Sequence, residues 1–329
     1  MAGDPGRTEA YDSGMLDVGD GNRVYWAVHG NPAGTPALYV HGGPGSGCGD
    51  AVPRFLDLRR YRVVMFDQRG CGRSTPHASD PATDMRHNTT DRLTADMERL
   101  RTHLGIDRWL LYGGSWGSTL ILAHAQRHPE RVSAVVVAGV TTTRRAEIDW
   151  LYRGVARFFP AQWERFRQGA ALSGRPAEAA DDRLAGGLVA DYARLLEHPD
   201  LAVRAQAAAE WCAWEDAVLS LEPSGRATPY SDRIGPARLA FVRICTHYFA
   251  HAAWLDEGEL IAGAHRLAGI PALLAHGRLD LSSPLDTAWE LARNWPGARL
   301  EIIDDVGHKG GPAMARLLSD ALDGFADFR

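Results

Sequence analysis

The 329-residue sequence contains only four cysteines, and no two of them form a C-x-x-C pair. In a chain of this length they are expected to be reduced and mostly buried, which argues against a disulfide framework. Residues 3–7 are polar where a secretory signal would be apolar. No uncharged apolar stretch approaches the roughly 18 residues that would suggest a membrane span. These absences predict a cytoplasmic protein that makes no contact with a membrane.

The sequence also has no excess of charge of one sign, with 36 basic and 41 acidic residues and a net charge of −5. Its densest basic cluster, Arg59, Arg60 and Arg62, leads directly into an apolar, strand-like run. Nucleic acid is therefore not an expected partner. The hydrophobic content of 45% is ample for a large core. The length suits two domains, or one α/β domain that carries an inserted lid.

Apolar runs and amphipathic segments alternate through the first 140 residues. The alternation favours a mostly parallel sheet that is covered by helices on both faces. Helical spacing of apolar residues marks the amphipathic segments, and short runs rich in β-branched and aromatic residues mark the strands. The predicted strands are Arg23–His29, Ala37–Val40, Arg62–Phe66, Trp109–Tyr112 and Val132–Ala138, and the predicted helices are Thr90–Leu104 and Ser118 to about His128.

The pattern changes after about Val140. From there to about Leu267 the sequence is helical in character and rich in tryptophan, with few strand-like runs. Strand-like runs return at Pro271–Ala275 and Arg299–Ile303. We therefore expect an α/β core made of residues 1–140 and 268–329, with residues 141–267 inserted as a helical cap.

A Gly-x-Ser-x-Gly pentapeptide at residues 113–117 lies between a predicted strand and a predicted helix. A nucleophile elbow requires this context, because its tight turn presents a serine above the sheet. Gly113 and Gly117 keep bulk away from the turn, and the N-terminus of the following helix stabilises developing negative charge. The sequence thus predicts the α/β-hydrolase fold with Ser115 as nucleophile, against the alternative of a turn that merely connects two elements.

A serine hydroxyl becomes a good nucleophile only when a base takes its proton. In this fold the chain order is serine, acid and then histidine. Asp280 and His308 each follow a predicted strand, and Asp280 would hold the tautomer of His308 and stabilise its imidazolium. Asp304 and Asp305 compete as the acid because they are close to His308 in sequence, and His276 lies near Asp280.

Acyl transfer also needs preorganised N–H donors for the tetrahedral oxyanion. One expected donor is the backbone N–H of Trp116, directly after the nucleophile. The other is expected from the Gly-rich loop at residues 41–45, and we assign it to Gly43, since glycine lets the backbone approach the substrate closely. This loop has neither of the two common phosphate-binding patterns, which disfavours a phosphate site.

Seven stretches of sequence resemble those of the proline iminopeptidases. The resemblance runs from about residue 15 to the C-terminus and implies an α/β-hydrolase with a helical cap. It implies a triad of Ser115, Asp280 and His308 that removes an N-terminal proline from peptides without a cofactor. The stretches are HGGPG at 41–45, DQRGCGRS at 67–74, NTT at 88–90, GGSWGS at 113–118, WxxWE at 211–215, HYF at 247–249 and HGRxD at 276–280.

The resemblance also implies substrate contacts. In the family, the glutamate of the W-x-x-W-E motif pairs with the free α-amine of the substrate, and here it is Glu215. A carboxylate beside a cationic amine gives a charge-assisted contact that selects N-termini. The alternative is a surface glutamate on a helix. Tyr152 is expected to line the same pocket.

The sequence departs from the family pattern around the expected pocket. Cys245 stands where the family usually has a second amine-binding glutamate, and Thr141 stands near the position of a phenylalanine that lines the proline pocket. Ser283 replaces a cysteine, and Lys309 follows the catalytic histidine where a serine is frequent. The hydrolytic machinery is thus retained, whereas the substrate pocket is altered.

These departures leave several functions open. The substrate is expected to be a small peptide, or else a small amide or ester of a specialised metabolite that is hydrolysed or used in acyl transfer. A catalytically silent binding protein is disfavoured by the intact triad. His124 and His128 are four residues apart and could suggest a metal pair, but no third ligand is evident, so no metal is expected. The sequence does not indicate an oligomeric state.

Overall fold

The computed structural model describes residues 9–49, 55–171, 186–224 and 226–327. An eight-stranded sheet with the order β1-β2-β4-β3-β5-β6-β7-β8 forms the centre of the core. The pairs β1–β2 and β2–β4 are antiparallel, and the remaining pairs are parallel. The strands are β1 (Asp12–Gly19), β2 (Asn22–Gly30), β3 (Thr35–Val40), β4 (Tyr61–Phe66), β5 (Trp109–Ser115), β6 (Val132–Val140), β7 (Ala272–Gly277) and β8 (Ala298–Ile303).

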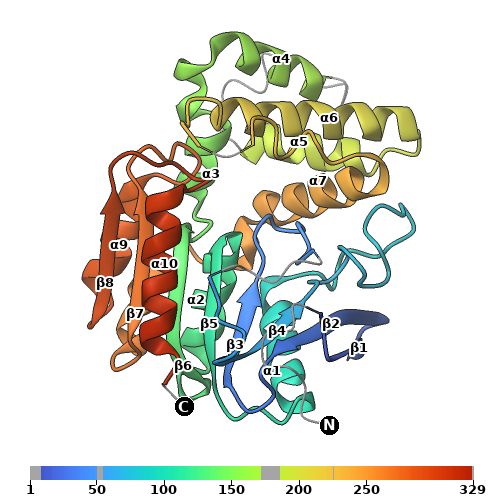
Figure 1. The fold of residues 1–329 in the computed structure, drawn as a ribbon. Helices are drawn as coiled ribbons and strands as arrows, with labels where there is room; N and C mark the ends of the chain where they lie inside the picture. Colours follow the sequence, from blue (N-terminus) through green and yellow to red (C-terminus); the bar gives the residue numbers. More distant parts are fainter. Residues whose placement is uncertain (1–8, 50–54, 172–185, 225, 328–329) are drawn as a thin grey trace.

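Helices cover both faces of this sheet, because successive residues of a buried strand point to opposite sides. Leu111 and Val135 join the apolar cluster beneath α1 (Thr90–His103), α2 (Trp116–Arg127) and α9 (Leu285–Asn294). Leu110 and Val136 join the cluster beneath α10 (Pro312–Phe325) on the other face. The expected parallel sheet with helices on both sides is confirmed, and Figure 1 shows α10 lying in front of it.

The chain between β6 and β7 forms a helical block above the carboxyl ends of the parallel strands (Figure 1). Its apolar core is separate from the two clusters of the sheet and is rich in aromatic rings such as Phe166, Tyr192 and Trp211. The block contains α3 (Arg145–Tyr152), α4 (Pro160–Ala171), α5 (Gly186–Leu196), α6 (Leu201–Val218), α7 (Gly235–Ala250) and α8 (Glu259–Ala262), with short 3₁₀ turns at Gly154–Phe158, Ala252–Trp254 and Gly263–Leu267.

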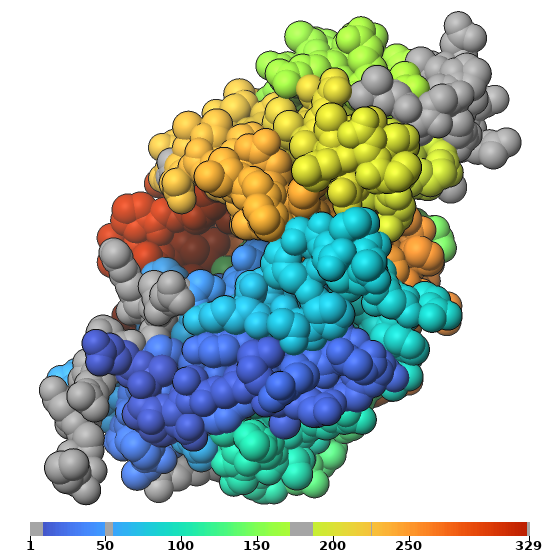
Figure 2. Space-filling view, turned by 90° about the vertical axis from the view of Figure 1, so that its right-hand side faces the viewer, coloured from blue at the N-terminus to red at the C-terminus, as the bar shows by residue number. Residues whose placement is uncertain are grey.

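Polar contacts join the helical block to the core. Arg243 on α7 donates to the carbonyl oxygens of Ala78, Asp80 and Thr83 at 2.7–3.0 Å. Figure 2 shows this part of the chain, in cyan, in contact with the yellow and orange helices of the block. These hydrogen bonds hold the block against the core at the loop that contains residues 78–83. No sequence pattern predicts this contact.

The first strand of the sheet was not predicted from the sequence. The sheet begins with β1, ahead of the first predicted strand, and β1 pairs with β2 as an antiparallel hairpin at the sheet edge. Its alternation of apolar and polar residues is weak because most of its side chains are at least partly exposed.

Within the described ranges, no helix is both long and apolar enough to cross a membrane.

Candidate active site

The candidate nucleophile Ser115 is the last residue of β5 and directly precedes α2. Its backbone has φ = 55° and ψ = −133°, a strained conformation for a residue with a side chain. The strain is tolerated because the neighbouring glycines allow close packing. A Cβ atom on either Gly113 or Gly117 would lie 2.4 Å from the carbonyl oxygen of Val40. The elbow therefore has room for its turn only with glycine at both positions.

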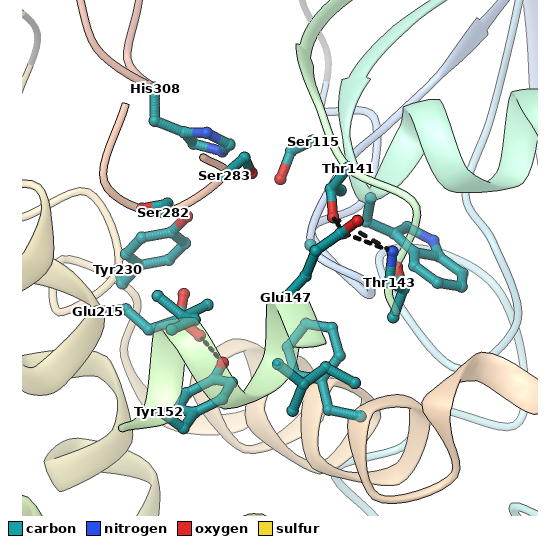
Figure 3. A pocket seen from close by; sticks show the side chains of 15 residues that line it. Ser115, Thr141, Thr143, Glu147, Tyr152, Glu215, Tyr230, Ser282, Ser283 and His308 are labelled. Carbon is teal, nitrogen blue, oxygen red and sulfur yellow. Dashed lines mark hydrogen bonds between the residues drawn. The ribbon is translucent and has the colours of Figure 1, made fainter. Parts of the chain in front are cut away.

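The structure brings the predicted acid and base together. Asp280 follows β7 and is 4% exposed, and its Oδ2 lies 2.8 Å from Nδ1 of His308, which follows β8. The other oxygen of Asp280 accepts from the backbone N–H of Ser283 at 2.8 Å. Ser115 and His308 line the same pocket and point into it (Figure 3). These side chains meet because β5, β7 and β8 end at one edge of the sheet.

The charges around His308 favour its protonated form. Burial opposes the imidazolium, but the charge and hydrogen bond of Asp280, with the charges of Glu222 and Glu215, raise the pKa of His308 to about 9. Glu222, from the turn after α6, accepts from the backbone N–H groups of His308 and Lys309, both at 2.8 Å. Residues from both the core and the helical block therefore position this histidine.

Two of the competing residues, Asp304 and His276, have other partners. Asp304 makes an ion pair with Arg278 at 2.5 Å, and both side chains are more than half exposed. His276 accepts from the backbone N–H of Val140 at 3.1 Å through Nδ1, so its Nε2–H donates to the carbonyl of Ser283 at 2.7 Å. His276 is therefore a structural residue of the loop that carries Asp280.

The expected oxyanion donors lie at the pocket. Gly43 and Trp116 both line it. Gly43 has φ = 119°, and a Cβ atom there would lie 2.6 Å from the backbone nitrogen of Gly45, so the loop requires glycine. Gln68 braces this loop against the elbow, since its Nε2 donates to the carbonyl of His41 at 2.9 Å and its Oε1 accepts from Trp116 Nε1 at 2.9 Å.

A buried carboxylate faces the nucleophile across the pocket. Glu215 on α6 is 8% exposed and accepts a hydrogen bond from the Tyr152 hydroxyl at 2.6 Å (Figure 3). Burial raises the pKa of Glu215 to about 7. No lysine, arginine or histidine within the described residues forms an ion pair with it. A buried carboxylate without a counter-ion is costly, so this site suits a cationic ligand.

The loop after β6 forms another wall of the pocket. Glu147 on α3, 8% exposed, accepts from the Thr141 hydroxyl at 2.5 Å and from the backbone N–H groups of Thr142 and Thr143, both at 2.8 Å. Thr141 lines the pocket as predicted, and so does Ser283. The hydrogen bonds of Glu147 are thus used to hold the loop in place.

The structure differs from the sequence-based expectation for Cys245. This residue is fully buried on α7, and its thiol donates to the carbonyl of Pro44 at 3.2 Å. It does not line the pocket. The helix packs directly on the Gly-rich loop, where a Cβ on Gly45 would meet Ile244 at 3.0 Å. Cys245 therefore lies behind that loop, and the expectation of a direct substrate contact is corrected.

Sequence reasoning missed four residues of the site: Glu147, Glu222, Tyr230 and Phe249. Phe249 belongs to the HYF stretch, so this motif could have indicated it. No local pattern distinguishes the other three. Regarding metals, no cluster of three or more histidine, cysteine or acidic side chains suited to an ion occurs in the part of the chain that the structure describes.

Comparisons with known proteins identify the fold and the family. Residues 35–311 match the family described as the alpha/beta hydrolase fold. A probable proline iminopeptidase from Streptomyces coelicolor is 47% identical over 97% of this chain and 96% of its own length. A proline iminopeptidase from Xanthomonas citri is 43% identical over 96% of this chain and 97% of its own length. A crystal structure of proline iminopeptidase from Mycobacterium smegmatis, 18% identical, covers 96% of this chain and 99% of its own with a TM-score of 0.58, which supports the fold.

The sheet order, the elbow and the family match together define a serine hydrolase of the α/β-hydrolase fold. The extent and identity of the full-length relatives then specify the group within that fold. The chain belongs to the proline iminopeptidase family.

Proposed function

We propose that this enzyme releases an N-terminal residue from short peptides, and that this residue is proline, as in the family. The observation that carries the proposal is Glu215, a buried carboxylate without a cationic partner among the described residues, in the same pocket as Ser115 and His308. A free α-amine would supply the missing positive charge. The names of the relatives support proline as the released residue.

In the proposed mechanism His308 removes the proton of Ser115 while its hydroxyl oxygen attacks the scissile carbonyl. Asp280 keeps the imidazole oriented through the 2.8 Å contact. The backbone N–H groups of Gly43 and Trp116 stabilise the oxyanion. His308 then gives its proton to the leaving amine, and water hydrolyses the acyl-enzyme by the same route. Residues 141–267 act as a cap that encloses the amine end of the substrate.

The direct test compares proline-p-nitroanilide with p-nitrophenyl acetate. Ser115→Ala is expected to abolish turnover of both substrates. Glu215→Gln is expected to raise KM for the proline substrate about tenfold to a hundredfold, because it removes a charge-assisted contact of about 1.5–3 kcal/mol. Ester turnover, which needs no amine contact, should remain within about twofold. An equal loss on both substrates would contradict the assigned role of Glu215.

A second candidate function is hydrolysis or acyl transfer on another small amide or ester. It is favoured by Thr141 in the pocket wall and by Cys245, which supplies no carboxylate at the second amine-binding position of the family. Faster turnover of N-acylated or ester substrates than of proline-p-nitroanilide would support this alternative. The cytoplasmic location expected from the sequence stays a prediction.

A further inference from the structure

A second, larger groove opens beside Ser115. Gly43, Ser115, Tyr230 and His308 line both this groove and the pocket that contains Glu215. The groove has a volume of about 460 Å³, compared with about 50 Å³ for the pocket. The nucleophile and its base therefore stand between a narrow site and a wide one. The narrow site suits one small residue, and the wide one suits a larger and more variable group.

The two sites have opposite charge. Among the residues that the structure describes, the pocket is lined by two glutamates and by no lysine or arginine. The described residues that line the groove include Lys309 and Arg233 and no aspartate or glutamate. The candidate base His308 lies at the boundary. A substrate that carries a cation at one end and an anion at the other would match this arrangement, with its scissile bond at Ser115.

The two cations of the groove have no acidic partner among the described residues. Within the described part of the chain, the one hydrogen bond of the Lys309 side chain is to the carbonyl oxygen of Arg226, 3.3 Å from Nζ. Arg233 donates to the carbonyl of Pro229 at 2.7 Å and to the Ser46 hydroxyl at 3.3 Å. These two contacts use two of its five N–H groups.

Lys309 is distinctive in the sequence, and Arg233 is held in a defined position at the groove. Lys309 is the only lysine among the 36 basic residues of the chain. Arg233 has its guanidinium 4.4 Å from the ring centroid of Phe241, which fixes its plane at the groove wall.

The described carboxylates near the groove have other partners. Glu222 is engaged by the backbone N–H groups of His308 and Lys309. Asp216 accepts from the backbone N–H groups of Tyr230 and Ser231, and Asp232 pairs with Arg226. The positive charge of the groove is therefore left for a ligand.

We infer that this groove binds the leaving group of a short peptide and that Lys309 and Arg233 receive its C-terminal carboxylate. The inference rests on the proposed function, because it places the amine end of the peptide at Glu215. The substrate class is thereby narrowed to short peptides with a free carboxyl terminus. Longer or amidated peptides would place no carboxylate at the two cations.

The chemistry of the leaving step is consistent with this placement. The bond between Ser115 Oγ and the acyl carbon forms, and the C–N bond of the peptide breaks. The proton that His308 took from Ser115 goes to the departing nitrogen, so the shortened peptide leaves with a neutral amine. His308 lines both the pocket and the groove. With the amine end of the substrate at Glu215, the nitrogen that His308 protonates is on the groove side of the scissile bond.

The test measures kcat/KM for release of proline from Pro-Gly and Pro-Gly-Gly, each as free acid and as C-terminal amide. The measured quantity is the ratio of acid to amide, since any disturbance of His308 affects both forms alike. We expect a ratio of about ten for at least one of the two lengths, since about 1.4 kcal/mol corresponds to a tenfold change. Raising the salt concentration should reduce the ratio, because the groove is open to solvent.

Substitutions in the groove test whether the preference for the free acid over the amide comes from Lys309. Lys309→Gln is expected to reduce the ratio severalfold, and Lys309→Arg should restore it because the positive charge returns. Arg59→Gln serves as the matched control, since Arg59 is exposed and pairs with Asp57 away from the groove. It should leave the ratio unchanged.

Two outcomes would overturn the inference. One is a ratio near one at both lengths in an enzyme that cleaves proline-p-nitroanilide. The other is a ratio above one that Lys309→Gln leaves intact. Absence of turnover of every proline substrate, including proline-p-nitroanilide, would instead refute the proposed function and the inference with it.

Discussion

Glu222 links the helical block to the candidate base, and its replacement provides a sharp test of the site. Its carboxylate accepts two hydrogen bonds of 2.8 Å from the backbone N–H groups of His308 and Lys309. The side chain packs so closely on this loop that a Cβ on Gly307 would lie 2.4 Å from its Cδ. Only 9% of Glu222 is exposed, so water cannot readily replace these contacts. We expect Glu222→Gln to loosen the loop that carries the base.

The magnitude follows from what glutamine can still do. Its carbonyl oxygen accepts one of the two N–H groups, whereas its amide nitrogen, which is a donor, faces the other. A hydrogen bond to a charged group contributes about 1.5–3 kcal/mol, and about this amount should be lost from the free energy of unfolding. A small displacement of a catalytic group is costly, so kcat should fall at least about tenfold. KM should change little, because the amine contact at Glu215 remains.

The charge change gives a second readout. The negative charge of Glu222 contributes to the raised pKa of His308, together with those of Asp280 and Glu215. Removing it lowers that pKa, so the acid limb of kcat/KM should move to lower pH. His276, whose Nε2 lies 3.8 Å from Oδ2 of Asp280, makes no contact with Glu222 among those described, so we expect the substitution to leave it in place.

The assay is the pH profile of kcat/KM for proline-p-nitroanilide, with thermal or urea unfolding measured on the same samples. Glu210→Gln is the control, since Glu210 also belongs to the helical block but pairs with the exposed Arg165. An acid limb that stays in place or moves to higher pH would refute the electrostatic reasoning. A rise in KM with unchanged kcat would refute the positioning role.

Two further predictions concern the elbow and the amine site. Gly117→Ala should lower the free energy of unfolding, measured in urea, by about 2–3 kcal/mol, since its Cβ would lie 2.4 Å from a backbone oxygen. Gly324→Ala is the control: no atom lies within 4 Å of its Cβ, so the free energy of unfolding should stay unchanged or rise slightly. KM for proline-p-nitroanilide should rise as pH falls through about 7, because Glu215 is then protonated and the charge that attracts the amine is lost; Glu215→Gln should remove this dependence, and its persistence would exclude Glu215 as the titrating group.

Local sequence patterns predict much of this fold because they act over short distances. The runs at Ala37–Val40 and Arg62–Phe66 fall within β3 and β4, and the apolar spacing of Thr90–Leu104 falls on α1. These segments are buried on one or both sides, so burial dictates their composition. The edge strand β1 was missed because most of its side chains are at least partly exposed and its alternation is weak.

The sequence by itself determined the α/β fold, the elbow at Ser115 and the candidates Asp280 and His308, because motif order and strand ends constrain them locally. Only the tertiary structure decided what each carboxylate around the site contacts. The W-x-x-W-E motif marks Glu215, whereas no local pattern marks Glu147 or Glu222. Glu147 holds a loop, Glu215 is buried without an ion-pair partner among the described residues, and Glu222 holds the backbone beside His308.

The tertiary structure likewise decided the contrast between Cys245 and Lys309, two departures from the family pattern. Cys245 faces Pro44 behind the Gly-rich loop, whereas Lys309 lines a groove that has no acidic side chain among the described residues. Neither placement follows from local pattern, because each depends on how the helical block packs against strand ends far away in the chain. The charges that surround a side chain depend on this packing. The function of a charged residue therefore cannot be inferred from its local sequence alone.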